Sequence, residues 1–133
     1  MLEKNPTAVK LVHKDFPIPN HQFSRQASVA ALAAGEQNKY WEYHDKIMQN
    51  FSNLSQQAFL DFAKELGLDM DAFQKSLMDP KHEKHITKDT QDGINAGLTG
   101  TPTIFLNGRL VTNRSLEGMT AMIEQELQKK KKK

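Results

Sequence analysis

Apolar residues recur at helical spacing through the middle of the chain. Between Phe59 and Leu66 they stand at positions i, i+3, i+4 and i+7, which places them on one buried face of a helix. Comparable stripes predict further helices that begin near residue 21 or 24 and that cover about 37–49, 70–77, 81–96 and 115–127. Ser55, Asp69 and Ser115 precede three of these helices, and such side chains accept a hydrogen bond from the first helical turn. The centre of the chain is therefore predicted to be a helical block.

Three shorter stretches have the composition of β-strands. Residues 103–107 are mostly β-branched, aromatic and aliphatic, and Asn107-Gly108 is typical of a tight hairpin turn because both residues tolerate a positive φ. Residues 109–113 are predicted to return antiparallel to them. Residues 8–13 are predicted to form another strand, because valine and leucine supply its apolar faces. The order of strand, helical block, strand, strand and helix predicts an α/β fold.

The segment before the hairpin reads Gly100-Thr101-Pro102-Thr103 and resembles the cis-proline loop of thioredoxin-fold proteins. The residues of this segment are most similar to those of the DsbA-like thiol–disulfide oxidoreductases. Three other stretches match that family in the same order: residues 9–17 resemble the strand after the active-site helix, 30–45 the inserted helical domain, and 115–127 the closing helix. The resemblance implies a thioredoxin-like core with a helical insertion, and a cis peptide bond between Thr101 and Pro102.

The resemblance also implies how the chain is divided. It predicts one thioredoxin-like domain over residues 1–133 that is incomplete at its N-terminal side, with residues 21–97 as the helical insertion and connecting helix. The family's Cys-x-x-Cys motif is absent from this sequence, together with the strand before it and most of the helix that it begins. The lysine run at 129–133 is predicted to be a disordered, solvated tail.

Composition excludes several classes of function. The net charge is +2, but the five lysines of the tail supply much of the positive charge. Removing these five from the 18 basic residues leaves 13 against 16 acidic residues, a net charge of −3, which is unlike a nucleic-acid-binding surface. No apolar run approaches membrane-spanning length. The first residues lack the apolar region of a signal peptide, so none is expected in this chain, although the parent protein can still be an exported one.

The sequence contains no cysteine, so the chain itself can hold no disulfide, zinc–thiolate site or thiol nucleophile. His82 and His85 are close enough to share a helical face, but Glu83 points elsewhere, and we expect structural or exposed histidines with no metal site. Trp41 and His44 also lie at helical spacing, which favours a place in the core. No nucleophile-elbow or glycine-rich phosphate loop is present, and no cofactor is expected.

Function is predicted from the resemblance. It implies that Thr101, Pro102 and Thr103 present their backbone to an extended peptide or protein substrate, and that this chain holds no catalytic residue of its own. The first hypothesis is a fragment or truncated member of a DsbA-like oxidoreductase that acts on exported proteins, with a periplasmic or other extracytoplasmic parent. The second is a cysteine-less thioredoxin-fold module that binds a protein partner, and the third is a relative of the kappa-class glutathione transferases.

The missing segment also affects the predicted sheet. In the thioredoxin fold, the strand before Cys-x-x-Cys lies at the centre of the sheet, between the strands predicted here at 8–13 and 103–107. Without it, both neighbours expose unpaired backbone groups, which favour pairing with another chain. The chain is therefore predicted to form a homodimer by strand exchange or edge pairing, unless residues 8–13 pair directly with the hairpin.

Overall fold

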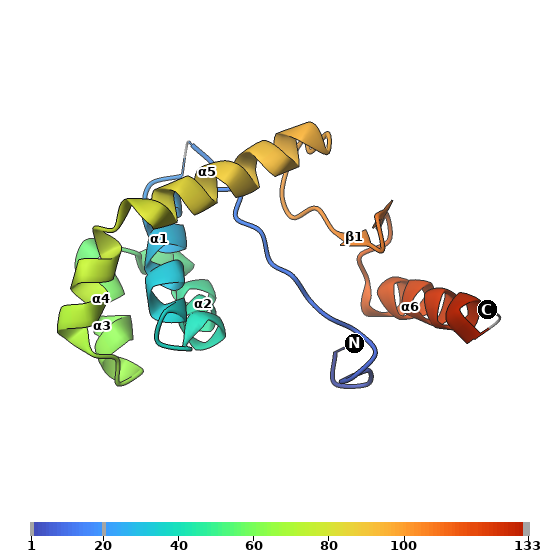
Figure 1. The fold of residues 1–133 in the computed structure, drawn as a ribbon, viewed down its shortest axis with the longest axis horizontal. Coiled ribbons are helices and arrows are strands. Elements are labelled where there is room, and N and C mark those ends of the chain that lie inside the picture. Colours follow the sequence, from blue (N-terminus) through green and yellow to red (C-terminus); the bar gives the residue numbers. More distant parts are fainter. Residues whose placement is uncertain (1, 20, 132–133) are drawn as a thin grey trace. The chain divides into compact units, whose positions relative to one another are not determined.

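A computed structural model describes residues 2–19 and 21–131 of the chain (Figure 1). These residues form two units. The helical unit comprises Lys14–Ala96, and the hairpin unit comprises the described residues before Lys14 together with those from Gly97 onward. The helical unit spans the stretch that the sequence predicts as an insertion, with boundaries that differ from the predicted 21–97.

The helical unit contains five α-helices and one short 3-10 helix. They are α1 (Ser24–Gly35), α2 (Tyr40–Gln49), η1 (Phe51–Asn53), α3 (Gln56–Glu65), α4 (Met70–Leu77) and α5 (Pro80–Asn95). Two predicted caps are confirmed, because the Ser55 side chain accepts a hydrogen bond from the Ala58 N–H and Asp69 accepts one from Ala72. The helical pattern of the sequence therefore identified this block correctly.

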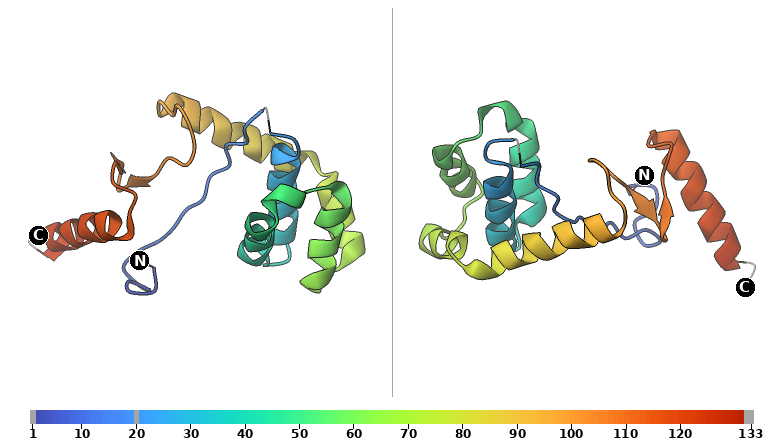
Figure 2. Two further views of the ribbon diagram at one scale, coloured as in Figure 1. Left: turned by 180° about the vertical axis from the view of Figure 1, so that it is seen from behind. Right: turned by 90° about the horizontal axis from the view of Figure 1, so that it is seen from above.

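Small residues along α1 allow the other helices to approach it closely. Its buried alanines are Ala27, Ala30, Ala31, Ala33 and Ala34. The helix contacts α2, α3, α4 and α5, and two further views show the helices of this unit from other sides (Figure 2). An alanine face has no long side chain to hold a neighbouring backbone away, so the bulky core residues come from the partner helices.

Aromatic side chains from α2, α3 and α4 fill the core around α1. Tyr43 and Phe73 are fully buried, and the Tyr43 ring lies 5.8 Å from the Phe73 ring and 5.9 Å from that of Phe62, measured between centroids. The Tyr43 hydroxyl donates a hydrogen bond of 2.8 Å to the Phe59 carbonyl oxygen. The ring thus packs in the core while its one polar atom remains satisfied.

The hairpin unit contains a short hairpin and a helix. Strand β1 (Phe105–Leu106) pairs antiparallel with β2 (Arg109–Leu110), and α6 (Leu116–Lys131) follows. Asn107 and Gly108 have φ angles of 49° and 82°, which confirms the predicted turn. The strands are much shorter than the predicted 103–107 and 109–113, with one further backbone bond of 2.8 Å from the Val111 N–H to the Ile104 carbonyl.

The strand predicted at residues 8–13 is wrong. Its first residue lies in a turn, the rest are irregular, and the sheet within the described part of the chain contains β1 and β2 alone. A strand is stabilised by hydrogen bonds to a neighbour, and the neighbour that the resemblance assigns to residues 8–13 is not in this sequence. These residues also do not pair directly with the hairpin.

The lysine-rich end also differs from its prediction. Lys129, Lys130 and Lys131 form the last turn of α6, where the sequence predicted a disordered tail, and Lys132 and Lys133 lie outside the described residues. Cations near the C-terminal end of a helix interact favourably with the helix dipole, and the Lys129 ammonium lies 3.3 Å from the Glu126 carboxylate. In the described ranges, no helix is long and apolar enough to cross a membrane.

Replacing Phe73 tests the core of the helical unit. Phe73→Ala is expected to lower the free energy of unfolding by about 3–5 kcal/mol, because it leaves a cavity among fully buried side chains. Met78, with 85% of its surface exposed, provides the control, and Met78→Ala is expected to change the free energy by less than about 0.5 kcal/mol. Urea unfolding followed by far-UV circular dichroism measures both, and equal effects would contradict the assigned core.

Candidate functional site

The three predicted site residues lie on one loop directly before β1. Thr101 and Pro102 are exposed and Thr103 is half-buried, and the peptide bond between Thr101 and Pro102 is cis, as predicted. We call residues 100–103 the proline loop. The loop belongs wholly to the hairpin unit.

Two side-chain hydrogen bonds hold the proline loop. The Thr103 hydroxyl donates to the Gly100 carbonyl oxygen at 2.6 Å, and the Arg114 guanidinium donates to the Pro102 carbonyl oxygen at 2.6 Å. Within the described part of the chain, the backbone N–H and C=O of Thr101 have no hydrogen-bond partner. An exposed backbone position of this kind can pair with an extended peptide.

Arg114 is a residue that the sequence analysis missed. It follows β2 by four positions and reaches the loop only because the hairpin turns the chain back. Its charged N–H makes a stronger hydrogen bond to a carbonyl than a neutral donor does. No local motif identifies the contact, since the two residues are joined through the hairpin rather than through helical or strand spacing.

His82 is buried, and the expectation of a structural histidine is confirmed for it. Its Nε2 lies 2.8 Å from the Ser76 hydroxyl and 3.9 Å from the Glu36 carboxylate. Burial lowers the pKa of His82 below its ordinary value, although the negative charge of Glu36 acts in the opposite direction. A side-chain hydrogen bond from Lys81 also holds the pKa of Glu36 below its usual range. The folded helical unit therefore favours the neutral imidazole of His82.

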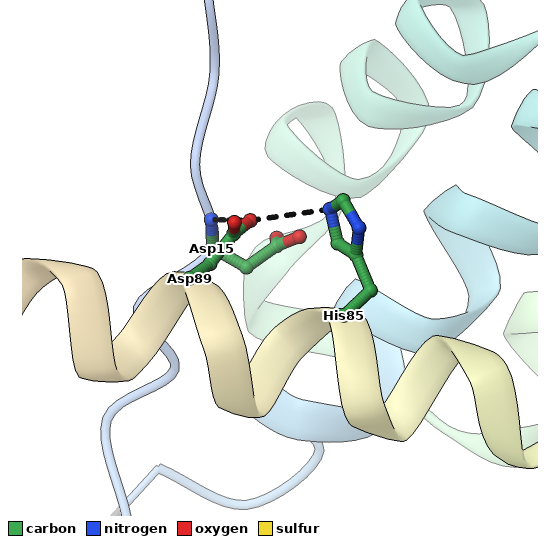
Figure 3. Close-up of side chains that lie close together, drawn as sticks. All are labelled: Asp15, His85 and Asp89. Carbon is green, nitrogen blue, oxygen red and sulfur yellow. Dashed lines mark hydrogen bonds and ion pairs between the residues drawn. The ribbon is translucent and has the colours of Figure 1, made fainter.

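His85 lies in a different cluster, which the sequence analysis did not foresee. Its Nε2 is 3.2 Å from Oδ2 of Asp89, and the Asp15 N–H donates to the same oxygen at 3.0 Å (Figure 3). Ligand atoms of Asp15, His85 and Asp89 all lie within 4.8 Å of one another. His82, which the sequence places on the same helical face as His85, is not part of this cluster. The i, i+4 spacing of His85 and Asp89 was visible in the sequence, whereas the approach of Asp15 was not.

The aromatic residues of α2 differ partly from their prediction. Trp41 keeps 43% of its surface exposed, and its ring makes an edge contact with the ring of His44, with 5.4 Å between the centroids. Tyr43 instead supplies the fully buried ring of this helix. The spacing alone did not decide which side of α2 faces α1.

Comparison with known proteins identifies the family. Residues 2–124 match the DSBA-like thioredoxin domain. The chain belongs to this family. A thioredoxin-like oxidoreductase from Silicibacter pomeroyi superposes with a TM-score of 0.72 and 28% identity, covering 90% of this chain and 68% of that one. The thiol–disulfide exchange protein alpha-DsbA2 from Wolbachia pipientis gives a TM-score of 0.75 and 26% identity, covering 84% and 62%. The fold is therefore the thioredoxin-like DsbA fold, with its inserted helices.

A curated relative carries a similar stretch within a much larger protein. A Na⁺/H⁺ antiporter from Salinispora tropica is 35% identical over 104 residues, which are 77% of this chain and 16% of the antiporter. The chain thus spans a small part of that relative and about two thirds of the two solved structures.

The buried His82 predicts a pH-dependent stability for the helical unit. Its folded pKa lies below the value of 6.5 expected when it is unfolded, so between these two values the unfolded chain binds more protons. The stabilising contribution is present in full above pH 6.5 and is lost as the pH falls through the folded pKa. The melting temperature is therefore expected to be lower at pH 5 than at pH 7.

Variants distinguish His82 from the other histidines. His82→Gln is expected to be less stable at pH 7 but to show a flatter pH dependence, while His21→Gln, at an exposed position, should follow the unmodified chain. Thermal unfolding followed by circular dichroism gives both profiles. An unchanged pH dependence in His82→Gln would show that the assignment is wrong.

Proposed function

We propose that this chain is the substrate-holding part of a DsbA-like thiol–disulfide oxidoreductase whose redox cysteines lie on a segment outside this sequence. The observation that carries the proposal is the exposed backbone of Thr101, on a loop fixed on both sides by Thr103 and Arg114. Membership of the DSBA-like family supports the choice of reaction. The similar protein from Wolbachia is itself a thiol–disulfide exchange protein, which supports the same choice.

The chemistry of disulfide exchange determines which part of the proposed reaction this chain can perform. A thiolate attacks one sulfur of a disulfide, a mixed disulfide forms, and the other sulfur leaves as a thiolate. This chain has no sulfur that can take either part, because its cysteine count is zero. Its contribution is to hold a substrate segment extended, with the Thr101 N–H donating to a substrate carbonyl and the Thr101 carbonyl accepting from a substrate N–H.

A cysteine-less binding module is the second candidate, and the absence of cysteine favours it. It would use the same loop to hold a protein partner without exchanging disulfides. The reading frame upstream of the gene segment distinguishes the two candidates. A Cys-x-x-Cys codon pattern about one helix length before Leu2 supports the enzyme, and an in-frame stop codon with a separate promoter supports the module. For the enzyme, the family resemblance favours a periplasmic or other extracytoplasmic parent.

The hairpin unit supports a further part of the proposal, which is association between two copies. Its β-strands are two residues long, and an isolated two-stranded hairpin is marginally stable in water. Large apolar side chains of this unit are exposed, namely Leu11, Val12, Phe105, Leu110 and Leu116. We infer a two-fold homodimer in which edge pairing covers some of these side chains.

Light scattering at micromolar concentration tests the association. The expected mass is twice the 15.1 kDa of one chain. Phe105→Lys places a charge on the edge strand and should shift the mass toward that of a single chain. Met78→Lys, at an exposed position of the helical unit, should leave the dimer intact. A single-chain mass for the unmodified protein would contradict the dimer.

Two measurements test the proposed substrate site. The isolated chain should not reduce insulin above the uncatalysed rate, because it has no thiolate. It should nevertheless bind an extended, cysteine-free peptide, with amide chemical-shift changes centred on Thr101 and Thr103 in an NMR titration. Insulin reduction by the pure chain would contradict the first expectation, and shift changes confined to the helical unit would contradict the second.

An arginine pair gives a matched control for the peptide titration. Arg114→Met removes the hydrogen bond to the Pro102 carbonyl and should weaken peptide binding several-fold, because the loop is no longer held. Arg109→Met also removes a guanidinium from the hairpin region, but its partner is Glu126 on α6. Equal losses in the two variants would show that Arg114 has no specific effect on the loop.

A further inference from the structure

We propose that Asp15, His85 and Asp89 form a binding site for one divalent transition-metal ion on the helical unit. The site shares no residue with the proline loop and does not depend on the proposed exchange function. Its three side chains point toward one another from α5 and from the segment that precedes α1 (Figure 3).

Two contacts bring the segment before α1 onto α5. The Asp15 N–H donates to Asp89 Oδ2 at 3.0 Å, and the Lys14 ammonium pairs with the Asp92 carboxylate at 2.9 Å. His85 and Asp89 stand one turn apart on α5, and residues at this spacing lie on the same face of a helix. The three ligand groups are thus placed by a backbone-to-side-chain hydrogen bond, an ion pair and helical geometry.

The distances fit a small metal ion. Zinc lies about 2.0–2.1 Å from histidine nitrogen and about 2.0–2.2 Å from carboxylate oxygen, so two ligands of a tetrahedral site are about 3.3 Å apart. His85 Nε2 and Asp89 Oδ2 are 3.2 Å apart, and all three ligand atoms lie within 4.8 Å.

The electrostatics of the cluster favour a cation. Asp15 and Asp89 each keep only 7% of their surface exposed, and two carboxylates close together in a buried site repel each other. The neighbouring Lys14 ammonium pairs with Asp92, and its hydrogen bond to Asp92 is the main cause of the raised pKa of Lys14. The charge of Asp89 raises that pKa further. Burial, with the charges of Asp15 and Asp89, raises the pKa of Tyr40, so its phenol stays neutral. A divalent ion would balance both carboxylates at once.

The donor set and its surroundings indicate the class of ion. One imidazole nitrogen with two carboxylate oxygens suits Zn²⁺ and similar first-row ions, and three protein ligands leave a coordination position open. Asp89 is also oriented by the Asp15 N–H, as metal-binding carboxylates commonly are by a backbone or side-chain donor. The His85 side chain is 53% exposed and lines a groove of about 470 Å³ with Tyr40 and Lys81, which gives an ion a route of entry.

A simple ion pair is the competing interpretation of the same geometry. In that case a proton, not a metal, would occupy the space between His85 Nε2 and Asp89 Oδ2. The two cases differ in their response to metal, because a proton-mediated pair has no affinity for Zn²⁺ beyond that of a surface histidine.

Calorimetric titration of the tag-free, chelator-treated 133-residue chain with ZnCl₂ separates the two cases. We expect one saturable site per chain and an increase in melting temperature when Zn²⁺ is added. His85→Gln should weaken the affinity at least about tenfold and remove the increase in melting temperature. Because His85 is half exposed, this variant is expected to remain folded, which circular dichroism checks.

Two variants provide matched controls. Glu83→Gln replaces an exposed carboxylate of α5 that pairs with Arg25 outside the cluster, and His21→Gln replaces an exposed histidine of the same unit. Both should bind Zn²⁺ as the unmodified chain does, whereas Asp89→Asn should lose affinity as His85→Gln does. The proposal is overturned if the unmodified chain shows no saturable site, or if His85→Gln binds Zn²⁺ as tightly as either control.

Discussion

The need of every β-strand for a paired neighbour separates the two units of this structure. The hairpin unit depends on such pairing, and the helical unit does not. A strand leaves its N–H and C=O groups unsatisfied unless a neighbour accepts and donates along its length. The hairpin unit has few such neighbours: β1 and β2 pair over two residues each, and residues 8–13 form no ladder. The helical unit satisfies its backbone within each helix and closes its own core around Tyr43 and Phe73.

This contrast explains what the sequence could and could not predict. Helices were found because their spacing and their caps at Ser55 and Asp69 are local, and the hairpin turn was found because Asn107-Gly108 determines it directly. The strand at 8–13 was not confirmed, because an apolar alternation becomes a strand only when another strand lies beside it. The hairpin strands are shorter than predicted for the same reason, because their length also depends on a neighbouring strand.

The candidate sites show the same difference between local contacts, which the sequence predicts, and long-range contacts, which it does not. Thr101, Pro102 and Thr103 are adjacent in sequence, so a resemblance sufficed to place them on one loop, but the support from Arg114 depends on the hairpin. In the proposed metal site, His85 and Asp89 share a helical face, while Asp15 is 74 residues from Asp89 and meets it only in the folded unit. Lys14 and Asp92 form a second contact between the same two segments, so the approach of Asp15 does not depend on one hydrogen bond.

The central claim is that this chain holds the substrate while a separate strand and helix supply the sulfurs. Its most direct test is a fusion of this chain to a preceding strand–helix segment that carries Cys-x-x-Cys, assayed for the rate of insulin disulfide reduction. The rate should rise well above the uncatalysed one, and it should fall when Arg114 is replaced by Met in the fusion. A fusion that folds, with helical content intact and both cysteines titratable, but that gives only the uncatalysed rate would contradict the claim.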